Sequence, residues 1–275
     1  MMTTTLRPSE PLQQHPDGTR SRRYRVCVNS RPVGEIHLGT SPALGAAGAR
    51  ILDLRIAEPD RRRGRGTVAA LTAEEVARSW GCTQIDAVVP VGAEAALRLF
   101  TALGYTLRNR GMEKRLAAVP PELPPGSRAR PMTGAEFDEW QEHESEQYTR
   151  EWIARGVPEA TARAKARDDH EMLLPDGLAT DGMLFSVLEH EGVRVGTLWV
   201  ALQDAGAFIF TVETATDRRG QGHGRALMLL AERQAIEAGR QVLGLNVFAG
   251  NTPAERLYAS LGYRTVNRSL AKPLG

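Results

Sequence analysis

The stretch Arg219-Gly220-Gln221-Gly222-His223-Gly224 decides how the rest of this 275-residue sequence is interpreted. It follows an apolar run at 208–212 and precedes a helical pattern at 225–238. The first N–H groups of a helix have no intrahelical partner, and the helix dipole favours negative charge there. Glycines let the backbone approach phosphate oxygens, and Arg219 adds a planar donor. The pattern predicts an anion-binding turn between a strand and a helix, although a plain tight connection would also use these glycines.

A second motif follows after the apolar run at 242–248. It reads Asn251-Thr252-Pro253-Ala254-Glu255-Arg256-Leu257-Tyr258, followed by Ala259-Ser260-Leu261-Gly262-Tyr263. Together the two motifs resemble the GNAT acetyltransferase superfamily. Its pyrophosphate loop reads Arg/Gln-x-x-Gly-x-Gly/Ala, and its later segment reads Asn-x-x-Ala-x-x-Leu-Tyr-x-x-x-Gly-Phe/Tyr. The two matches occur in the family's order and spacing, which makes the combined signal specific.

The resemblance implies acetyl-CoA as a co-substrate of the C-terminal half, and no metal. The residues that would hold its pyrophosphate are those of the loop: Arg219, Gly220, Gln221, Gly222, His223 and Gly224. The backbone of Val212 and Thr214 would pair with the pantetheine amides. Asn251 would contact the cofactor arm or cap the helix that follows it.

Acetyl transfer to an amine requires a neutral amine, a donor for the developing oxyanion and a proton for the departing thiolate. Tyr258 resembles the tyrosine that GNAT enzymes often place near the thioester sulfur, as an acid or a hydrogen-bond donor; the alternative is a core aromatic packed with Leu257 and Leu261. Glu213 lies where many relatives carry a carboxylate that takes a proton directly or through water. A solvent-facing strand glutamate is the alternative for Glu213.

The chain carries a second copy of this pattern. Residues 61–105 align without a gap on residues 219–263. Identical residues occur, among others, at positions 61, 64, 66, 71, 73, 74, 77, 81, 92, 96, 98, 99, 103, 104 and 105. The chemically active side chains are replaced, because Asn246, Asn251, Tyr258 and Glu213 align with Val88, Ala93, Phe100 and Arg55. The N-terminal copy is therefore expected to be catalytically degenerate, and whether Arg61, Gly64 and Gly66 still hold CoA stays open.

The predicted organisation is a flexible tail at 1–22, a degenerate GNAT-like domain at 23–118, a Pro-rich linker at 119–127 and a complete GNAT domain at 128–275. The fold class is α/β (α+β): two GNAT-like domains, each a mixed, mostly antiparallel twisted sheet flanked by helices. The N-terminal copy is expected to be truncated, without the first strand and the two helices that wall the acceptor site in GNAT enzymes.

Local patterns predict the elements. In the first domain we expect strands at 23–29, 33–39, 49–57, 84–89 and 105–117, helices at 66–80 and 93–103, and a hairpin turn at 31–34. In the second we expect a strand at 128–131, a helix that a Thr133–Glu136 capping box begins and Gly156 ends, and a helix from Pro158 to Leu174. Strands at 183–189, 194–202 and 207–214 then precede the glycine loop, and the family resemblance implies that two strands close the domain.

Composition limits the remaining possibilities. A formal net charge of +2 disfavours nucleic-acid binding driven by bulk charge, and two cysteines indicate a reducing cytoplasm rather than a disulfide framework. No apolar run reaches transmembrane length, and we expect no membrane partner. The Asp168-Asp169-His170-Glu171 run is interpreted as a polar helix face. The acidic residues at 136, 138, 139, 142, 144 and 146 either attract a cationic amine or form a solvated face.

The sequence thus predicts an N-acetyltransferase that moves an acetyl group from acetyl-CoA to a primary amine of a small molecule or peptide, by direct attack in the C-terminal domain. The alternative is an acyl-CoA-binding regulatory or scaffold protein with little turnover. The two-domain layout is similar to that of mycothiol synthase, but no acceptor-specific motif supports that substrate. The acceptor amine, the acyl-chain preference and the choice between monomer and homodimer stay open.

Overall fold

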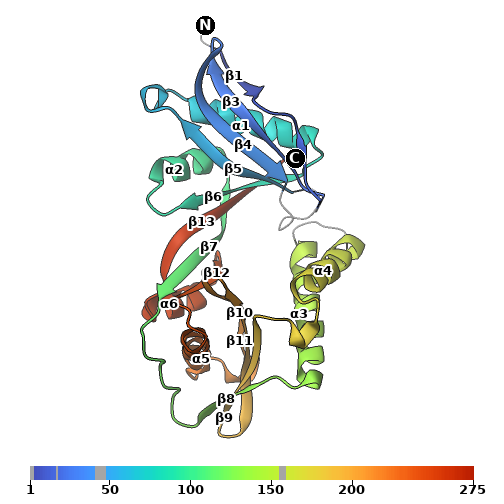
Figure 1. Ribbon diagram of the computed structural model, residues 1–275, viewed down its shortest axis with the longest axis vertical. Helices are drawn as coiled ribbons and strands as arrows, with labels where there is room; N and C mark the ends of the chain where they lie inside the picture. Colours follow the sequence, from blue (N-terminus) through green and yellow to red (C-terminus); the bar gives the residue numbers. More distant parts are fainter. Residues whose placement is uncertain (1–2, 17, 41–47, 155–158) are drawn as a thin grey trace. The chain divides into compact units, whose positions relative to one another are not determined.

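The computed structural model describes residues 3–16, 18–40, 48–154 and 159–275 (Figure 1). The chain divides into two compact units. Unit 1 comprises Met1–Gly111, Val247–Gly250 and Thr265–Gly275, and unit 2 comprises Met112–Asn246 and Asn251–Arg264. The end of the chain therefore belongs to the same unit as its beginning.

Unit 1 is a mixed sheet covered by helices. Its elements are β1 (Thr4–Pro8), β2 (Gln13–Gln14), β3 (Arg20–Val28), β4 (Arg31–Thr40), β5 (Gly48–Ile56), α1 (Arg65–Ser79), β6 (Gln84–Pro90), α2 (Glu94–Ala102), the first part of β7 (Thr106–Arg115) and nearly all of β13 (Arg264–Pro273). The strand order is β1-β3-β4-β5-β6-β13, with β2 beside β3. β5 and β6 run parallel, and the other pairs in this order are antiparallel.

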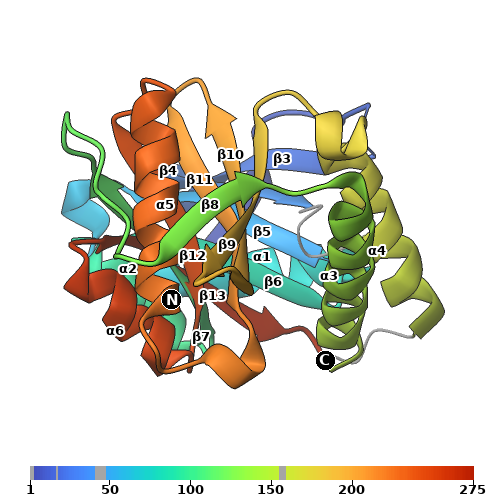
Figure 2. The same cartoon turned by 90° about the horizontal axis from the view of Figure 1, so that it is seen from below.

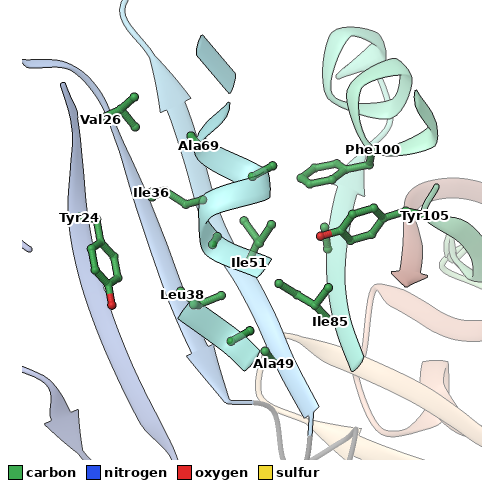
Figure 3. Close-up of a cluster of buried hydrophobic side chains, with 14 of the residues drawn as sticks. Tyr24, Val26, Ile36, Leu38, Ala49, Ile51, Ala69, Ile85, Phe100 and Tyr105 are labelled. Atoms are coloured by element: carbon green, nitrogen blue, oxygen red, sulfur yellow. The ribbon is translucent and has the colours of Figure 1, made fainter. Parts of the chain in front are cut away.

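The core of unit 1 follows from alternation along its strands, since every second strand residue faces the same side. Tyr24 and Val26 of β3 and Ile36 and Leu38 of β4 are buried on one side of the sheet (Figure 3). The helix α1 contributes small buried residues at 69, 70, 73 and 77, which let its backbone approach the strands closely.

The N-terminal segment differs from the expected flexible tail, because Thr4–Pro8 forms β1 and pairs with β3 in the register Thr4↔Val28 to Pro8↔Tyr24. Ladder hydrogen bonds come from the backbone, so a polar sequence can form an edge strand. Unit 1 therefore has a first strand after all. The described residues between β1 and β3 form β2 and no helix, which confirms the expectation that this unit lacks the two helices that precede the second strand in unit 2.

Unit 2 has the predicted order of elements as far as its last helix. It contains β8 (Ser127–Pro131), α3 (Gly134–Ala154), α4 (Glu159–Leu173), β9 (Met183–His190), β10 (Val193–Gln203), β11 (Gly206–Thr214), α5 (His223–Glu237), most of β12 (Val242–Phe248) and α6 (Thr252–Ser260). The strands lie in the order β12-β11-β10-β9-β8, and only β11 and β12 are parallel. In Figures 1 and 2, α5 lies on one face of this sheet and α3 on the other.

The beginning of α3 confirms the predicted capping box. Glu136 accepts a hydrogen bond from the backbone N–H of Thr133 at 2.9 Å, and the Thr133 hydroxyl accepts one from the N–H of Glu136 at 3.3 Å. The Arg130 guanidinium lies on the same carboxylate at 2.7 Å and, with the Thr133 N–H, lowers the pKa of Glu136 to about 2. The expected helix boundaries at Gly156 and Pro158 lie outside the described residues.

Buried aromatic rings fix the same helix to the sheet. Phe137 and Trp140 of α3 contact Phe185 of β9, with ring centroids 4.8 and 5.1 Å apart, and Trp140 also lies edge-on to Trp199 of β10. Such pairs stabilise packing beyond the area that they bury. The remaining residues of α3 are thereby held in a defined orientation towards the sheet.

Two local predictions were wrong. A single strand, rather than two, follows the last helix, because β13 continues without a break from Arg264 to Pro273. The turn between β3 and β4 lies at Asn29 and Ser30, both with positive φ, and not at 31–34. Pro32 can enter a strand at its start, where the missing N–H costs little.

The strand β13 completes unit 1 by pairing with β6, from Asn267↔Pro90 to Pro273↔Gln84. Lys272 reaches the buried carboxylate of Glu74 on α1 at 2.7 Å. Unit 2 contains the equivalent pair one repeat away, since Lys114 of β7 reaches Glu232 of α5, also at 2.7 Å. Each buried glutamate is thus neutralised by a lysine encoded in the other half of the sequence.

Candidate active site

The parallel strands β11 and β12 of unit 2 pair only over a short region. Their register runs from Ala207↔Leu243 to Ile209↔Leu245, whereas β11 continues to Thr214. Beyond Ile209 the edge of β11 that faces β12 has no strand partner in the described register. Val212 and Thr214 lie in this free stretch, where an extended amide-containing chain can add to the strand edge.

The glycine loop leaves the N-terminus of α5 open. Gly222 is the N-cap residue at φ 89°, and no side chain caps the helix. Gly220 also has a positive φ of 78°, a conformation that costs little for glycine alone. The first-turn N–H groups therefore remain available to an anion. Arg219 donates from Nε to the Thr214 carbonyl at 3.3 Å, which leaves its other nitrogens able to bind a phosphate.

Three elements of unit 2 meet at Gly224. A Cβ atom at this position would lie 3.3 Å from Leu257 Cδ2 on α6 and 3.6 Å from Thr214 Oγ1 on β11. The first of these distances is tighter than ordinary van der Waals contact, which explains why a glycine suits the position. The loop is consequently held against the strand that carries Glu213 and the helix that carries Tyr258.

The helix α6 begins with a side-chain cap. Asn251 Oδ1 accepts a hydrogen bond from the Ala254 N–H at 3.3 Å, which realises the capping interpretation of this residue. Tyr258 is buried, with 7% of its surface exposed, and this burial raises the pKa of its phenol. Within the described part of the chain its hydroxyl has no hydrogen-bond partner. The phenol therefore stays protonated at neutral pH and has a proton to donate.

Glu213 faces α3 rather than open solvent alone. Its Oε2 lies 3.5 Å from Nε2 of His143, and 29% of its side chain is exposed. Thr211, two residues earlier on the same face of β11, donates its hydroxyl to Oε2 of Glu144 at 3.1 Å. Two carboxylates and an imidazole are thus gathered between α3 and β11.

Glu144 is half-buried, and burial raises the pKa of its carboxyl, an effect that the negative charge of Glu213 reinforces. Among the described residues no lysine or arginine pairs with it. A carboxylate in this setting is costly to ionise unless a cation approaches. The pair formed by Glu144 and Glu213 accordingly favours a positively charged ligand.

The sequence analysis did not single out His143, and it named Glu144 only as one of six acidic residues of the predicted helix. A signal was present, because position 144 continues the apolar stripe of Phe137, Trp140 and Tyr148, whose spacing of three and four residues marks the buried face. An acidic residue on a buried face points to a partner or a ligand. The other five acidic residues of this helix have different surroundings. Glu136 caps the helix. The remaining four are exposed: Asp138, Glu139, Glu142 and Glu146.

Two further segments that the sequence analysis considered make contacts within unit 2. His223 is buried and its ring lies 5.1 Å from that of His190; burial first, and then the neighbouring charges, lower the pKa of its imidazole. Asp169 accepts hydrogen bonds from the Tyr148 hydroxyl at 2.6 Å and from Lys165 at 2.7 Å. Within the described ranges no group of three or more acidic, histidine or cysteine residues has the geometry of a metal site.

A separate groove of about 880 Å³ lies in unit 2 between the first strands and the C-terminal half of α5. Arg128, Met132, Phe185 and Gln234 are among its lining residues. None of the predicted site residues lines it. The groove is therefore distinct from the site at the N-terminus of α5.

Unit 1 repeats the framework of this site. Gly64 is the uncapped N-cap of α1 at φ 72°, and Arg61 donates from Nε to the Ile56 carbonyl at 2.9 Å, as Arg219 does to Thr214. A Cβ atom on Gly66 would lie 3.6 Å from Leu99, the equivalent of Leu257. The strands β5 and β6 also separate, since their pairing ends at Ile51↔Ala87.

Comparison with known proteins also finds one family pattern in both halves of the chain. A sequence profile described as "Acetyltransferase (GNAT) family" matches residues 4–105 and again residues 137–263. The chain is 28% identical over 149 residues to a Bacillus subtilis (strain 168) protein named "Uncharacterized N-acetyltransferase YdgE", a match that covers 52% of this chain and 95% of that protein. A second protein of the same strain, "Uncharacterized N-acetyltransferase YycN", is 28% identical over 151 residues, covering 52% and 96% of the two chains.

Solved structures share the two-copy layout. A "Tandem GNAT protein from the clavulanic acid biosynthesis pathway" superposes with a TM-score of 0.56 at 21% identity, covering 95% of this chain and 85% of that one. A "GCN5-related N-Acetyltransferase from Sphaerobacter thermophilus" gives 0.61 at 21% identity, with coverages of 92% and 80%. At these identities the likeness concerns the fold.

No helix within the described residues is both long and apolar enough to cross a bilayer.

Proposed function

Because the chain belongs to the acetyltransferase (GNAT) family, we propose that it transfers an acetyl group from acetyl-CoA to a primary amine of a small molecule or peptide, with catalysis in unit 2. The observation that carries this proposal is the convergence at Gly224, where the uncapped helix α5, the free edge of β11 and the helix α6 meet. Each of these elements would contribute a different group to the binding of the thioester or to the reaction with the amine.

The proposed acetyl-CoA site follows the free edge of β11 into the glycine loop. The backbone of Val212 and Thr214 would pair with the pantetheine amides, and the first-turn N–H groups of α5 would bind the pyrophosphate. The residues assigned to this phosphate end are Arg219, Gly220, Gln221, Gly222, His223 and Gly224. Asn251 would act mainly by capping α6 and so placing Tyr258. The absence of a side-chain cap on α5 supports a site that takes an anion.

The proposed chemistry is direct attack. The amine nitrogen forms a bond to the acetyl carbon, and the carbon–sulfur bond breaks. Glu213 takes a proton from the amine directly or through water, and Tyr258 gives its phenolic proton to the departing thiolate. Burial, which raises the pKa of Tyr258, keeps that proton in place at neutral pH. His143, 3.5 Å from Glu213, is placed to receive the proton and pass it to solvent.

Glu144 would form the acceptor end of the site. A protonated amine that enters between α3 and β11 would meet Glu144 and Glu213 before it loses its proton. The attraction would raise the local concentration of cationic acceptors over neutral or anionic ones. Since Cys27 and Cys82 are both free and buried, we also propose a reducing, cytoplasmic setting for the reaction.

The decisive experiment measures thiol release from acetyl-CoA with a panel of amines: polyamines, aminoglycosides, amino acids, cysteinyl sugars and peptides. Amine-dependent release that falls in Tyr258→Phe is the expected result. A protein that binds acetyl-CoA and releases no CoA with any amine would contradict the proposal and favour a regulatory acyl-CoA-binding protein.

A further inference from the structure

The aromatic cluster that fixes α3 to the sheet has one ring that reaches solvent. Phe185, Trp199 and Phe210 are stacked in a row, with ring centroids 5.5 Å apart in the first pair and 4.4 Å apart in the second. Phe185 and Trp199 are buried, whereas Phe210 is 38% exposed. Because Trp199 covers only one face of Phe210, the other face is available to a ligand. An exposed aromatic ring gains free energy when an apolar group covers it.

A β-bulge directs Phe210 towards the same side of the sheet as Trp199. In the register of β10 and β11, Trp199 pairs with Thr211 and Val200 pairs with Ile209, which leaves Phe210 without a partner residue. An extra residue of this kind interrupts the regular alternation of side chains along a strand. Phe210 and Thr211 consequently both lie on the face that carries Trp199.

The exposed ring lies beside the acidic end of the proposed acceptor site. The hydroxyl of Thr211, the residue next to Phe210, donates to Glu144 of α3 at 3.1 Å. Glu144 lies one helical turn after Trp140, whose ring is 5.4 Å from that of Trp199. Adjacent residues are only about 3.8 Å apart at their Cα atoms. A ligand whose cation binds Glu144 therefore has the ring of Phe210 within reach of its next few carbon atoms.

Unit 1 has the same bulge without the ring. The register of β4 and β5 shifts between His37 and Leu38, and Leu52 is left without a partner. Leu52 is the equivalent of Phe210 in the repeat, and it is likewise exposed. The bulge thus belongs to the framework that both units share. The aromatic ring is particular to unit 2, like the carboxylate and the phenol that we assign to the reaction.

From this arrangement we infer that the acceptor of unit 2 is a primary amine joined by a short chain to an aromatic ring, and that Phe210 selects it. The ammonium group binds at Glu144, and the ring stacks on the free face of Phe210. The inference rests on the proposed function, whose acceptor it specifies. As proposed above, the nitrogen–carbon bond forms and the carbon–sulfur bond breaks; Glu213 takes a proton from the amine, and Tyr258 gives one to the thiolate.

The choice of an aromatic amine follows from what each class of amine would cover. A polyamine supplies the cation for Glu144 and leaves the ring of Phe210 in water. A saturated ring covers Phe210 but gains only the burial of apolar area. An aromatic ring adds the stacking contribution, about 0.5–1.5 kcal/mol beyond area burial, which corresponds to about twofold to tenfold in affinity.

The experiment compares three primary amines with the full chain: ethylamine, 2-cyclohexylethylamine and 2-phenylethylamine. Thiol release from acetyl-CoA gives kcat and KM for each amine, and titration calorimetry in the presence of CoA gives the Kd without turnover. Phe210→Leu gives unit 2 the side chain of unit 1, and Phe210→Tyr keeps the aromatic face. Leu52→Phe places a ring at the equivalent bulge of unit 1 and is the matched control.

We expect kcat/KM for 2-phenylethylamine to exceed that for ethylamine about tenfold, because the ring buries apolar area on Phe210. The ratio of kcat/KM between 2-phenylethylamine and 2-cyclohexylethylamine should fall about fivefold in Phe210→Leu, mainly through a higher KM. It should return in Phe210→Tyr and stay unchanged in Leu52→Phe. Comparing the same two amines between variants cancels the difference in their basicity.

Two results would overturn the inference and leave the proposed function in place. One is equal kcat/KM for ethylamine and 2-phenylethylamine. The other is a ratio between the two ring-bearing amines that Phe210→Leu does not change. Binding of 2-phenylethylamine that Phe210→Leu weakens, without acetyl transfer to any amine, would support the ring-binding site and contradict the proposed function. Neither binding nor transfer with any of the three amines would contradict both.

Discussion

The two units share a backbone framework and differ in the side chains that surround it. Both have an uncapped helix behind a glycine in the left-handed region, an arginine bonded to the last carbonyl of the preceding strand, and a glycine packed against a leucine of the next helix. Only unit 2 adds Glu213, Tyr258 and the helices α3 and α4. The comparison teaches that the backbone framework belongs to the fold, whereas the chemistry that we propose depends on a few replaceable side chains.

Each unit also contains one buried ion pair between residues far apart in the sequence. Glu74 and Glu232 are both almost fully buried, and each is paired with a lysine from the last strand of the other sequence half. Tyr105 and Tyr263 lie beside these pairs, with the lysine nitrogens 5.7 and 5.8 Å from the ring centres. The pairs occupy equivalent positions in the repeat, so they offer a direct comparison of the stability of the two units.

The largest expected effect comes from breaking these pairs. Lys272→Met leaves Glu74 buried without a counter-ion, and Lys114→Met does the same to Glu232. Removing one partner of a buried pair costs about 3–5 kcal/mol of the free energy of unfolding. Urea denaturation followed by fluorescence and circular dichroism measures the loss. Arg163→Met, which removes an exposed partner of Glu159, is the control and should cost under about 1 kcal/mol. If both lysine variants lost as little stability as Arg163→Met, the buried pairs would contribute little to the free energy of unfolding.

The partners in these ion pairs could not be predicted from the sequence. The repeat, the glycine loops and most helices and strands follow from local patterns, because periodicity and capping act within a few residues. The pairing of β13 with β6 does not follow from local patterns, since the choice of a partner strand depends on contacts between residues far apart in the chain. The same holds for β1, whose polar residues gave no alternation to detect.

At the site, the sequence predicts features that the backbone sets, but it does not predict features that side-chain packing sets. The open N-terminus at Gly222 follows from the motif. The position of Glu144 depends on how α3 lies on β11, and that orientation is set by the aromatic cluster around Phe185 and Trp199. The sequence placed an acidic residue on the buried face, but only the three-dimensional packing identifies Thr211 as its neighbour.

The second prediction tests the chemical difference between the units. Tyr258→Phe turns this position into its unit 1 counterpart, Phe100, and should lower kcat by about 100-fold, because general acids contribute at least that much. The KM for acetyl-CoA should change little, and steady-state thiol release measures both constants. Tyr263→Phe removes a hydroxyl from the neighbouring ring, 6.2 Å away, and should leave kcat unchanged. Equal kcat values for the two variants would remove Tyr258 from the mechanism.

The third prediction tests the shared framework. Gly222→Val forces a β-branched residue to a φ of 89°, which costs about 2 kcal/mol or distorts the loop. Acetyl-CoA affinity in unit 2 should fall about 30-fold, since 1.4 kcal/mol corresponds to tenfold. Titration calorimetry with acetyl-CoA measures the change.

Gly239→Val provides the control for that strain. Gly239 follows the other end of α5 and has a similarly positive φ of 75°. This variant should lose stability and keep its affinity for acetyl-CoA. If both substitutions weakened binding equally, the effect would come from general strain on α5 and not from the phosphate loop.

The smallest expected effect concerns Glu144, which has no acidic counterpart in unit 1 because that unit lacks α3. Burial raises the pKa of its carboxyl, so the folded protein holds the proton more tightly than the unfolded chain does. The stabilising contribution of this group is therefore present at low pH and is lost as the pH rises through the folded-state pKa. Glu144→Gln should slightly raise Tm at pH 7 and leave Tm unchanged at pH 4.

The same substitution should weaken the acceptor end of the site. With one carboxylate gone, the KM for a cationic amine should rise a few-fold while kcat stays nearly constant, because Glu213 and Tyr258 remain. Glu142→Gln removes the same charge from an exposed position of α3 and is the matched control. Thermal unfolding at the two pH values and steady-state kinetics measure both consequences. A lower Tm at pH 7 together with an unchanged KM would show that Glu144 stabilises unit 2 and does not meet the acceptor.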